Sequence, residues 1–263
     1  ASITGGVAMA GGTNTGTFTF NGGTLKPLAS SAVFMQNLTA ATVKDGGAVI
    51  DTDGFEITVA QPLLHAAGAT ASPLTKSGAG TLTLTGTNTL KGPVAVNAGT
   101  LTLAGAARLG SGNLSSAVLN NGALVFAGDA DQTLAGTVSG SGSLTLNGAG
   151  TLTLSGRTPY AGDTTLHAGR LVVSSGGSLS NSAVTLAAGT ALSLRVYSGD
   201  GAWSCKSLAL GGGTVTASFF FYGASPSAVT APLLVNGDLV NDGTLNVAVD
   251  GAALTNGVYP LIR

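Results

Sequence analysis

The sequence contains very little charge. Its 263 residues include 10 Lys and Arg and 11 Asp and Glu, so charged residues make up 8% of the chain and the formal net charge is −1. Ordinary soluble domains devote roughly a quarter of their residues to charge. The cations are also scattered along the chain. This distribution excludes the basic surface by which proteins bind nucleic acid or an anionic membrane, so we expect neither partner.

Residues that build disulfides and metal sites are equally scarce. Cys205 is the single cysteine, which excludes an internal disulfide, and we interpret it as a small buried hydrophobe without a role. His65 and His167 have no Cys or acidic residue at metal-ligand spacing, so we expect no metal and no cofactor. The uncharged stretch 207–237 is long enough to span a bilayer, but Gly and Pro interrupt it. We therefore expect no membrane insertion of this segment.

The chain is instead rich in glycine and in regularly spaced aliphatic residues. Glycine occupies 42 positions, and hydrophobic residues make up 44% of the sequence. A chain rich in Gly and Ser can be disordered, but this one has enough apolar surface to offset the entropy lost on folding. The sequence therefore predicts a folded protein.

An internal repeat is the strongest signal in the sequence. Residues 76–103 align without a gap to residues 146–173, at a constant offset of 70. Both copies contain Thr-Leu-Thr-Leu, which alternates with period two, as a strand with one buried face requires. The recurring glycines of the first copy are Gly78, Gly80, Gly86, Gly92 and Gly99. We interpret these positions as the skeleton of the repeat.

Short strands of this kind, such as Thr81–Thr85 and Thr100–Leu103, recur along the whole chain, and no stretch has helical periodicity. Most junctions read Ala-Gly-Thr or Gly-x-Gly, which favours a coil that stacks each turn parallel on the last. The sequence thus predicts an all-β fold, a parallel β-helix forming a single elongated domain over residues 1–263. At about 20 to 25 residues a coil, we expect roughly ten to thirteen coils. Stacking also explains the low charge, because like charges would repel at about 4.8 Å between strands.

The repeat also identifies a family. Residues 78–86, followed by Gly92 and residues 97–103, closely resemble the passenger-associated transport repeat of autotransporter proteins. The second copy keeps the pattern, with Tyr160 at the position of Leu90. The resemblance implies a right-handed β-helix that is extracellular, on the surface of a Gram-negative bacterium. We expect the chain to be a fragment of a longer passenger, since neither terminus has a polar cap.

Candidate catalytic residues are few. Polysaccharide-cleaving β-helices need carboxylates that converge on one groove. The sequence offers two pairs at i, i+2 spacing: Asp51 with Asp53, and Asp129 with Asp131. Both pairs adjoin glycines, so we interpret them first as turn residues whose side chains bond their own backbone. They remain weak acidic candidates.

A second candidate surface is aromatic. Residues Phe219, Phe220, Phe221 and Tyr222 are consecutive, and a strand must place about two of the four outside the core. Trp203 and Tyr197 break the repeat rhythm in the same half of the chain. Exposed rings could stack on sugar, dock a partner or pack beneath a loop. We predict a binding surface or a subunit interface here.

Three functions remain compatible with the sequence. The leading hypothesis is a non-catalytic structural or adhesive segment, with a glycan or a host or matrix surface as its partner. Self-association into an extracellular fibre is the alternative, favoured by low charge and uncapped ends. A polysaccharide-processing enzyme is the second alternative, and we expect the chain not to be an enzyme.

Overall fold

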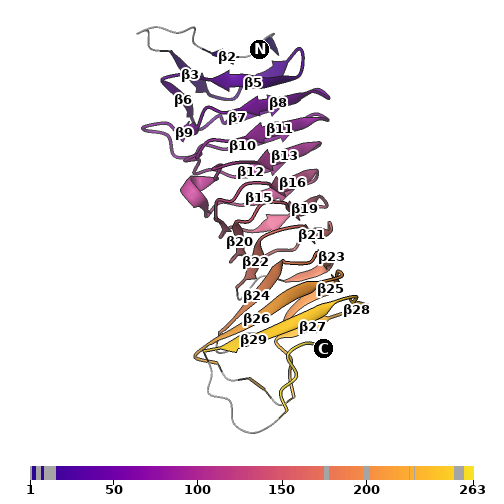
Figure 1. The fold of residues 1–263 in the computed structure, drawn as a ribbon. Helices are drawn as coiled ribbons and strands as arrows, with labels where there is room; N and C mark the ends of the chain where they lie inside the picture. Colours follow the sequence, from indigo (N-terminus) through magenta and orange to yellow (C-terminus); the bar gives the residue numbers. More distant parts are fainter. Residues whose placement is uncertain are drawn as a thin grey trace.

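In the computed structural model the chain forms an all-β rod (Figure 1). The structure describes residues 2–3, 7–8, 16–174, 178–197, 202–224, 226–227, 229–251 and 258–263. All the strand pairings recorded among these residues are parallel, and each strand stacks on the equivalent strand of the next turn. The rod is a β-solenoid of about 9 turns. The predicted fold class is confirmed.

The strands form four ladders along the rod. The first sheet contains β1 (Ser2–Ile3), β4 (Thr24–Pro27), β7 (Ala48–Asp51), β10 (Leu74–Ser77), β12 (Val94–Val96), β15 (Val118–Asn120) and β18 (Val138–Ser139). The second sheet contains β2 (Val7–Ala8), β5 (Ser31–Gln36), β8 (Glu56–Val59), β11 (Thr81–Leu84), β13 (Thr100–Leu103), β16 (Ala123–Phe126), β19 (Ser143–Leu146), β21 (Thr164–Leu166), β23 (Leu179–Leu186), β25 (Trp203–Leu210), β27 (Leu233–Val235) and β28 (Leu239–Asn241). The third sheet contains β14 (Asn113–Leu114), β17 (Gln132–Leu134), β20 (Thr151–Leu154), β22 (Arg170–Val173), β24 (Ala191–Tyr197), β26 (Thr214–Tyr222) and β29 (Thr244–Asp250). The fourth contains β3 (Thr17–Phe20), β6 (Ala40–Val43) and β9 (Leu63–His65), and a short 3-10 helix spans Gly110–Gly112.

The length of a turn varies along the rod. In the central part Thr81 pairs with Thr100 of the next turn. Near the C-terminus Thr214 pairs with Thr244, so that one turn there takes up a much longer stretch of sequence. The prediction of ten to thirteen coils was therefore too high, because the turns lengthen where the strands do.

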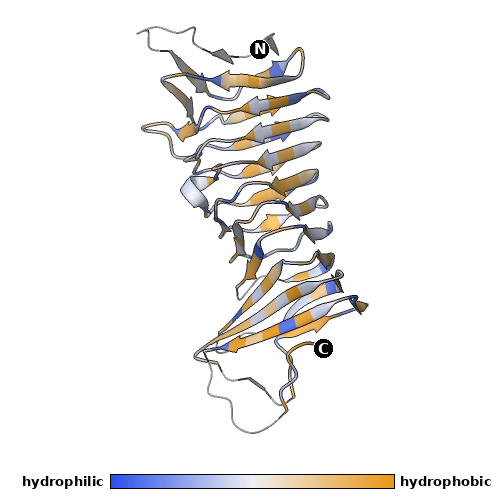
Figure 2. Ribbon diagram, in the orientation of Figure 1, coloured by the Kyte–Doolittle hydropathy of each residue, from blue (hydrophilic) through white to orange (hydrophobic). Residues whose placement is uncertain are grey.

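The core is a set of aliphatic columns that run along the rod axis. In the second sheet one inward column passes through buried leucines of successive strands. Its central members are Leu82, Leu101, Leu124 and Leu144. Residues between them point outward and are mostly Thr, so hydropathy alternates along each strand (Figure 2). Burying each leucine contributes roughly 1.5–3 kcal/mol, and the continuous column explains why the solenoid needs no disulfide.

The two copies of the sequence repeat lie on different faces of the rod. In the first copy β11 and β13 stack in the second sheet, whereas in the second copy β20 and β22 stack in the third. Three turns carry the chain from Thr81 to Ser143, and Thr151 then begins a strand on the next face. Each copy therefore specifies a strand, one turn and a stacked strand, but does not specify the face.

Glycine allows the turns to approach closely at the corners of the coil. Gly80 has a φ of +88°, and a Cβ there would lie 2.3 Å from the Phe55 carbonyl oxygen. Its counterpart in the second copy, Gly150, would place a Cβ 2.8 Å from the Ala130 carbonyl oxygen. Both positions require glycine, since a real Cβ contact is not this short. The predicted role of these glycines as the skeleton of the repeat has this steric cause.

The C-terminal turns differ from the rest of the rod. Strands β23, β25 and β26 have 8, 8 and 9 residues, against 3 or 4 in most central strands. After β18 the first sheet contributes no further strand among the described residues, so the long strands of the second and third sheets enclose the core (Figure 1). In the part of the chain that the structure describes, no helix is long and apolar enough to cross a membrane.

Candidate functional site

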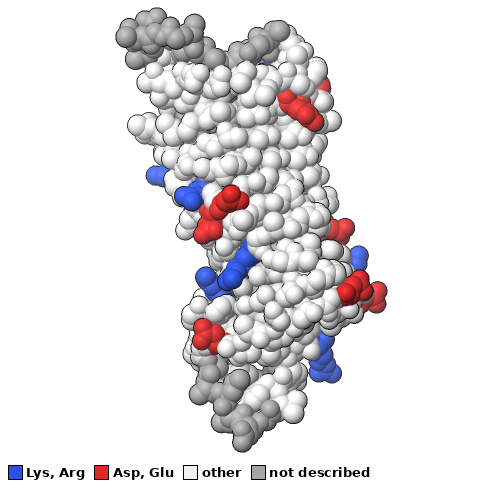
Figure 3. Space-filling model, viewed as in Figure 1, with Lys and Arg blue, Asp and Glu red and all other residues white. Residues whose placement is uncertain are grey.

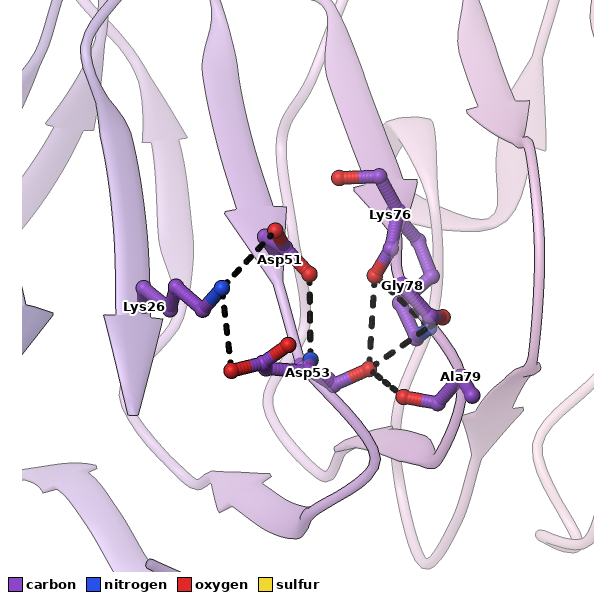
Figure 4. Close-up of polar contacts among 8 residues, drawn as sticks. Lys26, Asp51, Asp53, Lys76, Gly78 and Ala79 are labelled. Carbon is purple, nitrogen blue, oxygen red and sulfur yellow. Dashed lines mark hydrogen bonds and ion pairs between the residues drawn. The ribbon is translucent and has the colours of Figure 1, made fainter. Parts of the chain in front are cut away.

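The first acidic pair lies at a corner of the rod, where both carboxylates share one lysine. Asp51 ends β7, and its Oδ1 accepts a hydrogen bond from the Asp53 amide at 3.0 Å. The ammonium of Lys26, one turn earlier, lies 2.9 Å from Asp53 and 3.7 Å from Asp51 (Figure 4). Hydrogen bonding to Asp53 raises the pKa of Lys26. The turn interpretation of this pair has direct structural support, and both carboxylates are engaged in structure.

A buried lysine lies behind the same corner. Lys76 is completely buried, and its Nζ donates hydrogen bonds to the carbonyl oxygens of Ser77, Gly78 and Ala98 at 3.1, 2.7 and 3.0 Å. Loss of solvation lowers the pKa of Lys76 to about 8, and the charge of Asp51 opposes this shift. Because Ala98 belongs to the following turn, the ammonium ties two turns together. Sequence reasoning missed this residue, since it occupies an ordinary inward position of a strand.

Thr52 completes the corner from the preceding turn. It is also fully buried, and its hydroxyl donates to the Ala79 carbonyl at 2.5 Å. The corner thus links successive turns through Lys26, Asp51, Thr52 and Lys76. Its polar atoms satisfy backbone groups and each other, which is the requirement for buried polar groups in a stable core.

The second acidic pair has the same structural use. The Asp129 carboxylate accepts the Ala149 amide at 3.0 Å, and the Asp131 carboxylate accepts the Thr151 amide at 2.8 Å. Both bonds reach the next turn of the solenoid. Asp45 does likewise with the amides of Thr70 and Ala71, and these bonds lower its pKa.

The fold does not bring the two candidate pairs together. Asp51 ends a strand of the first sheet, whereas Asp129 follows β16 in the second. Three steps of the first-sheet ladder separate β7 from β15, which is roughly 14 Å along the axis at about 4.8 Å a step. Glycosidase carboxylates lie about 5–9.5 Å apart. The pairs therefore do not form one acid–base constellation.

A serine–histidine contact occurs elsewhere in the core. The Ser72 hydroxyl lies 3.0 Å from Nδ1 of His65. Ser72 is fully buried, and its oxygen already accepts the Lys91 amide at 2.8 Å. A buried hydroxyl in this role joins two turns and has no access to a substrate. Among the described residues, no group of three or more His, Cys, Asp or Glu could hold a metal ion.

Two buried amides connect neighbouring turns between β9 and β17, where strand pairing is interrupted. Asn88 accepts the Leu63 amide at 2.9 Å and donates to the Arg108 carbonyl at 3.0 Å. Gln132 accepts the Leu109 amide at 2.7 Å and donates to the carbonyl of the same residue at 3.1 Å. These side chains replace strand pairing where the backbone is irregular. Sequence reasoning did not find them.

The predicted aromatic surface is divided between the core and the exterior. Phe219 and Phe221 are buried, and so is Trp203, whose exposed fraction is 7%. These three side chains are therefore removed from the candidate surface. Phe220 is half-buried on the outward side of β26, as is Arg195, its partner in the register of β24.

Two tyrosines form the exposed part of that surface. Tyr197 and Tyr222 are paired in register, and their rings stack with centroids 5.1 Å apart and planes at 19°. Their exposed fractions are 37% and 48%. Cys205, in β25 of the second sheet, is fully buried, and desolvation raises its pKa to about 11, so the thiol is part of the core.

Charge is sparse on the surface of the rod. Figure 3 shows charged residues in small isolated groups on a largely uncharged face. The acidic, amide and hydroxyl side chains described above mostly connect one turn with the next. These features define a parallel β-solenoid whose polar residues hold its turns in register.

Comparison with known proteins finds one family model that matches two segments of the chain. Residues 74–103 and 144–173 match the passenger-associated-transport-repeat model. Together with the parallel solenoid, the two repeats match the β-helix of an autotransporter passenger and indicate a passenger segment. Such repeats imply a secreted or surface protein of a Gram-negative bacterium. No curated protein and no solved structure gives a significant match.

Proposed function

We propose that the chain is a non-catalytic, extracellular structural and adhesive segment of an autotransporter-like surface protein. The observation that carries this proposal is that the candidate acidic side chains are engaged in holding the structure together. Asp51, Asp53, Asp129 and Asp131 all bond to backbone or to Lys26, and the two pairs lie at different corners. A rod that stacks its turns in this way is suited to hold other parts of a protein away from the cell.

The experiment that tests this proposal compares the wild-type chain with a variant carrying alanine at all four aspartates. The readout is release of reducing ends from a panel of plant, bacterial and host polysaccharides. We expect no release by either protein. Glycan cleavage by the wild type that the variant lacks would overturn the non-catalytic assignment. The single variants D129A and D131A serve as folding controls, because they disturb one corner only.

Self-assembly into a fibre is a second candidate with its own observation. Strand β29 pairs with β26, and no strand covers its other edge among the described residues. Val247, in an inward position of β29, is 49% exposed, and Leu239 and Val240 of β28 are similarly exposed. Open strand edges and apolar surface favour association.

Negative-stain electron microscopy over a concentration series separates the two candidates. Single rods at every concentration support the structural and adhesive segment, and filaments that lengthen with concentration support the fibre. Replacing Val247 with Lys places a charge on the open edge and should abolish filaments. V125K, an outward position in the middle of the second sheet, is the matched control and should leave them intact.

A further inference from the structure

A groove in the second sheet opens where β5 bulges away from β8. Ser31 pairs with Ile57, and Met35 pairs with Val59, so β5 has three residues between these pairs where β8 has one. Of these three residues, Ala32 and Val33 are exposed, Val33 to 51%, whereas Phe34 is buried in the core. Bulges often occur beside functional sites because they redirect side chains.

The groove has a volume of about 340 Å³. This lies at the lower end of the roughly 300–1,000 Å³ that small-molecule sites occupy. Its lining is formed by Ser30, Ser31, Ala32, Glu56, Ile57, Thr58, Thr81 and Thr83. We call this the Ser30–Thr83 groove.

The chemistry of the lining is dominated by hydroxyl groups. Five of the eight lining residues are Ser or Thr, and each hydroxyl can donate one hydrogen bond and accept others. The Ser30 hydroxyl oxygen already accepts a hydrogen bond from the Glu56 amide at 3.0 Å, which ties the residue before β5 to the start of β8. The exposed Ala32 adds a small apolar area, whereas the Ile57 side chain points into the core and only its backbone borders the groove. Hydroxyls beside a small apolar area are complementary to a sugar, which offers hydroxyl groups around C–H faces.

The charge of the lining further limits the class of ligand that can bind. Glu56 is the one charged residue of the lining and is exposed, and no Lys or Arg takes part. An anionic ligand would be repelled, and a single carboxylate is too few for a metal site of the usual oxygen-rich kind. An amino group on the ligand would instead be attracted by Glu56.

The groove continues onto the regular part of the sheet. Thr81 and Thr83 pair with Thr100 and Thr102 of the next turn, and these four side chains form two outward columns. At about 4.8 Å between turns, the columns give an extended chain repeated hydrogen-bonding groups along the rod axis. A polymer can therefore place one unit in the groove and neighbouring units on the columns.

We propose that the Ser30–Thr83 groove binds one unit of a saccharide chain that is neutral or carries amino groups. This proposal deepens the adhesive part of the proposed function and rests on it. The probes are chitotriose, its deacetylated amine form and trigalacturonate, titrated into the full chain by calorimetry. We expect the first two to bind with dissociation constants of about 1 mM or tighter, the amine form more tightly, and the anion not to bind.

Variants of the groove give the decisive comparison. T83V replaces a lining hydroxyl with a methyl group of similar shape, and should weaken binding of both ligands about tenfold. T145V makes the same change in the same outward column, beyond the groove, and should bind as the wild type does. E56Q should weaken the amine trimer more than chitotriose. T81V provides a second test should T83V fold poorly.

Three results would overturn the proposal. These are no binding of chitotriose or of its amine form, preference for trigalacturonate, or equal affinities of T83V and T145V. None of these results bears on the rod or on its lack of catalysis, which electron microscopy and the reducing-end assay test separately. A failed saccharide site is thus distinguishable from a failed structural assignment.

Discussion

The central turns and the C-terminal turns solve the same packing problem in different ways. In the central turns Thr81 pairs with Thr100 and Leu144 with Thr164, so each turn is short, and the inward side chains of its strands are buried. In the C-terminal turns Leu208 pairs with Leu239, which makes the turn clearly longer. The C-terminal turns also hold eight of the eleven large hydrophobic residues that are exposed in the described chain.

The difference shows what protects a solenoid core. A central turn has a neighbour on each side, so its inward side chains are covered and its backbone is paired twice. The last described turn has one neighbour, and its inward Val247 remains half exposed. Burial in this architecture therefore depends on the position of a turn in the stack as much as on its sequence, as expected for a nearest-neighbour fold.

The largest expected change in stability comes from replacing one leucine in each region. L101A removes a side chain with no exposure, and L245A removes one that is half-buried in β29. We expect a loss of about 2–5 kcal/mol for L101A and about 1 kcal/mol for L245A, because the latter leaves little cavity. Urea unfolding followed by circular dichroism measures both. Equal losses would show that the last turn is as well covered as the centre.

A glycine pair tests the close approach of the central turns. Gly80 and Gly223 both have positive φ, but a Cβ at Gly223 meets nothing within 4 Å. G223A should cost about 1–2 kcal/mol from φ alone. G80A adds the contact with the Phe55 carbonyl and should cost roughly 2–4 kcal/mol. Thermal unfolding of the two variants gives the difference, and similar midpoints would contradict a steric role for Gly80.

Much of the fold could be predicted from the sequence, because solenoid turns repeat local signals. The alternation in Thr81–Leu84 and Thr100–Leu103 identified strands that the structure has within a residue of the predicted limits. Their parallel stacking followed from glycine-rich corners and scarce charge. The face on which each strand lies could not be predicted, since turns vary in length and the spacing of the two repeat copies is not a whole number of them.

The candidate sites were less predictable for a physical reason. Strand alternation identifies inward positions by their apolar residues. A polar residue at an inward position is therefore not recognised as buried. Lys76, Asn88 and Gln132 are buried because carbonyl and amide groups from adjacent turns meet them there. Such partners are a full turn away in sequence. The burial of Trp203 could not be predicted for the same reason, because it lies in a long strand that pairs with β27 one turn later.

The buried ammonium of the central region gives a pH-dependent test. Burial lowers the pKa of Lys76 to about 8 from an unfolded value near 10.5. The unfolded chain therefore binds more protons between these values, so stability should rise as pH increases from about 8 to 10.5. The full shift corresponds to about 3 kcal/mol, and the three carbonyl acceptors reduce it by favouring the charged form.

K76M removes this titration and supplies the comparison. Its unfolding free energy, measured in parallel with the wild type from pH 7 to 10, should lack the rise attributed to Lys76. The difference between the two proteins should therefore change with pH in favour of the wild type. A constant difference across this range would mean that Lys76 keeps an ordinary pKa. K206M, at an exposed position in the C-terminal region, is the control.

The smallest expected effect concerns the exposed tyrosine pair of the C-terminal turns. Stacking of Tyr197 and Tyr222 contributes about 0.5–1.5 kcal/mol beyond burial, so Y222S should lower stability by about 1 kcal/mol. Y160F, in the centre, removes a hydroxyl that bonds Thr164 within the core. It should cost about as much, although it deletes one atom, because Thr164 then loses a buried partner. A negligible cost for Y160F with a large one for Y222S would reverse the comparison and place the more tightly coupled packing in the C-terminal turns.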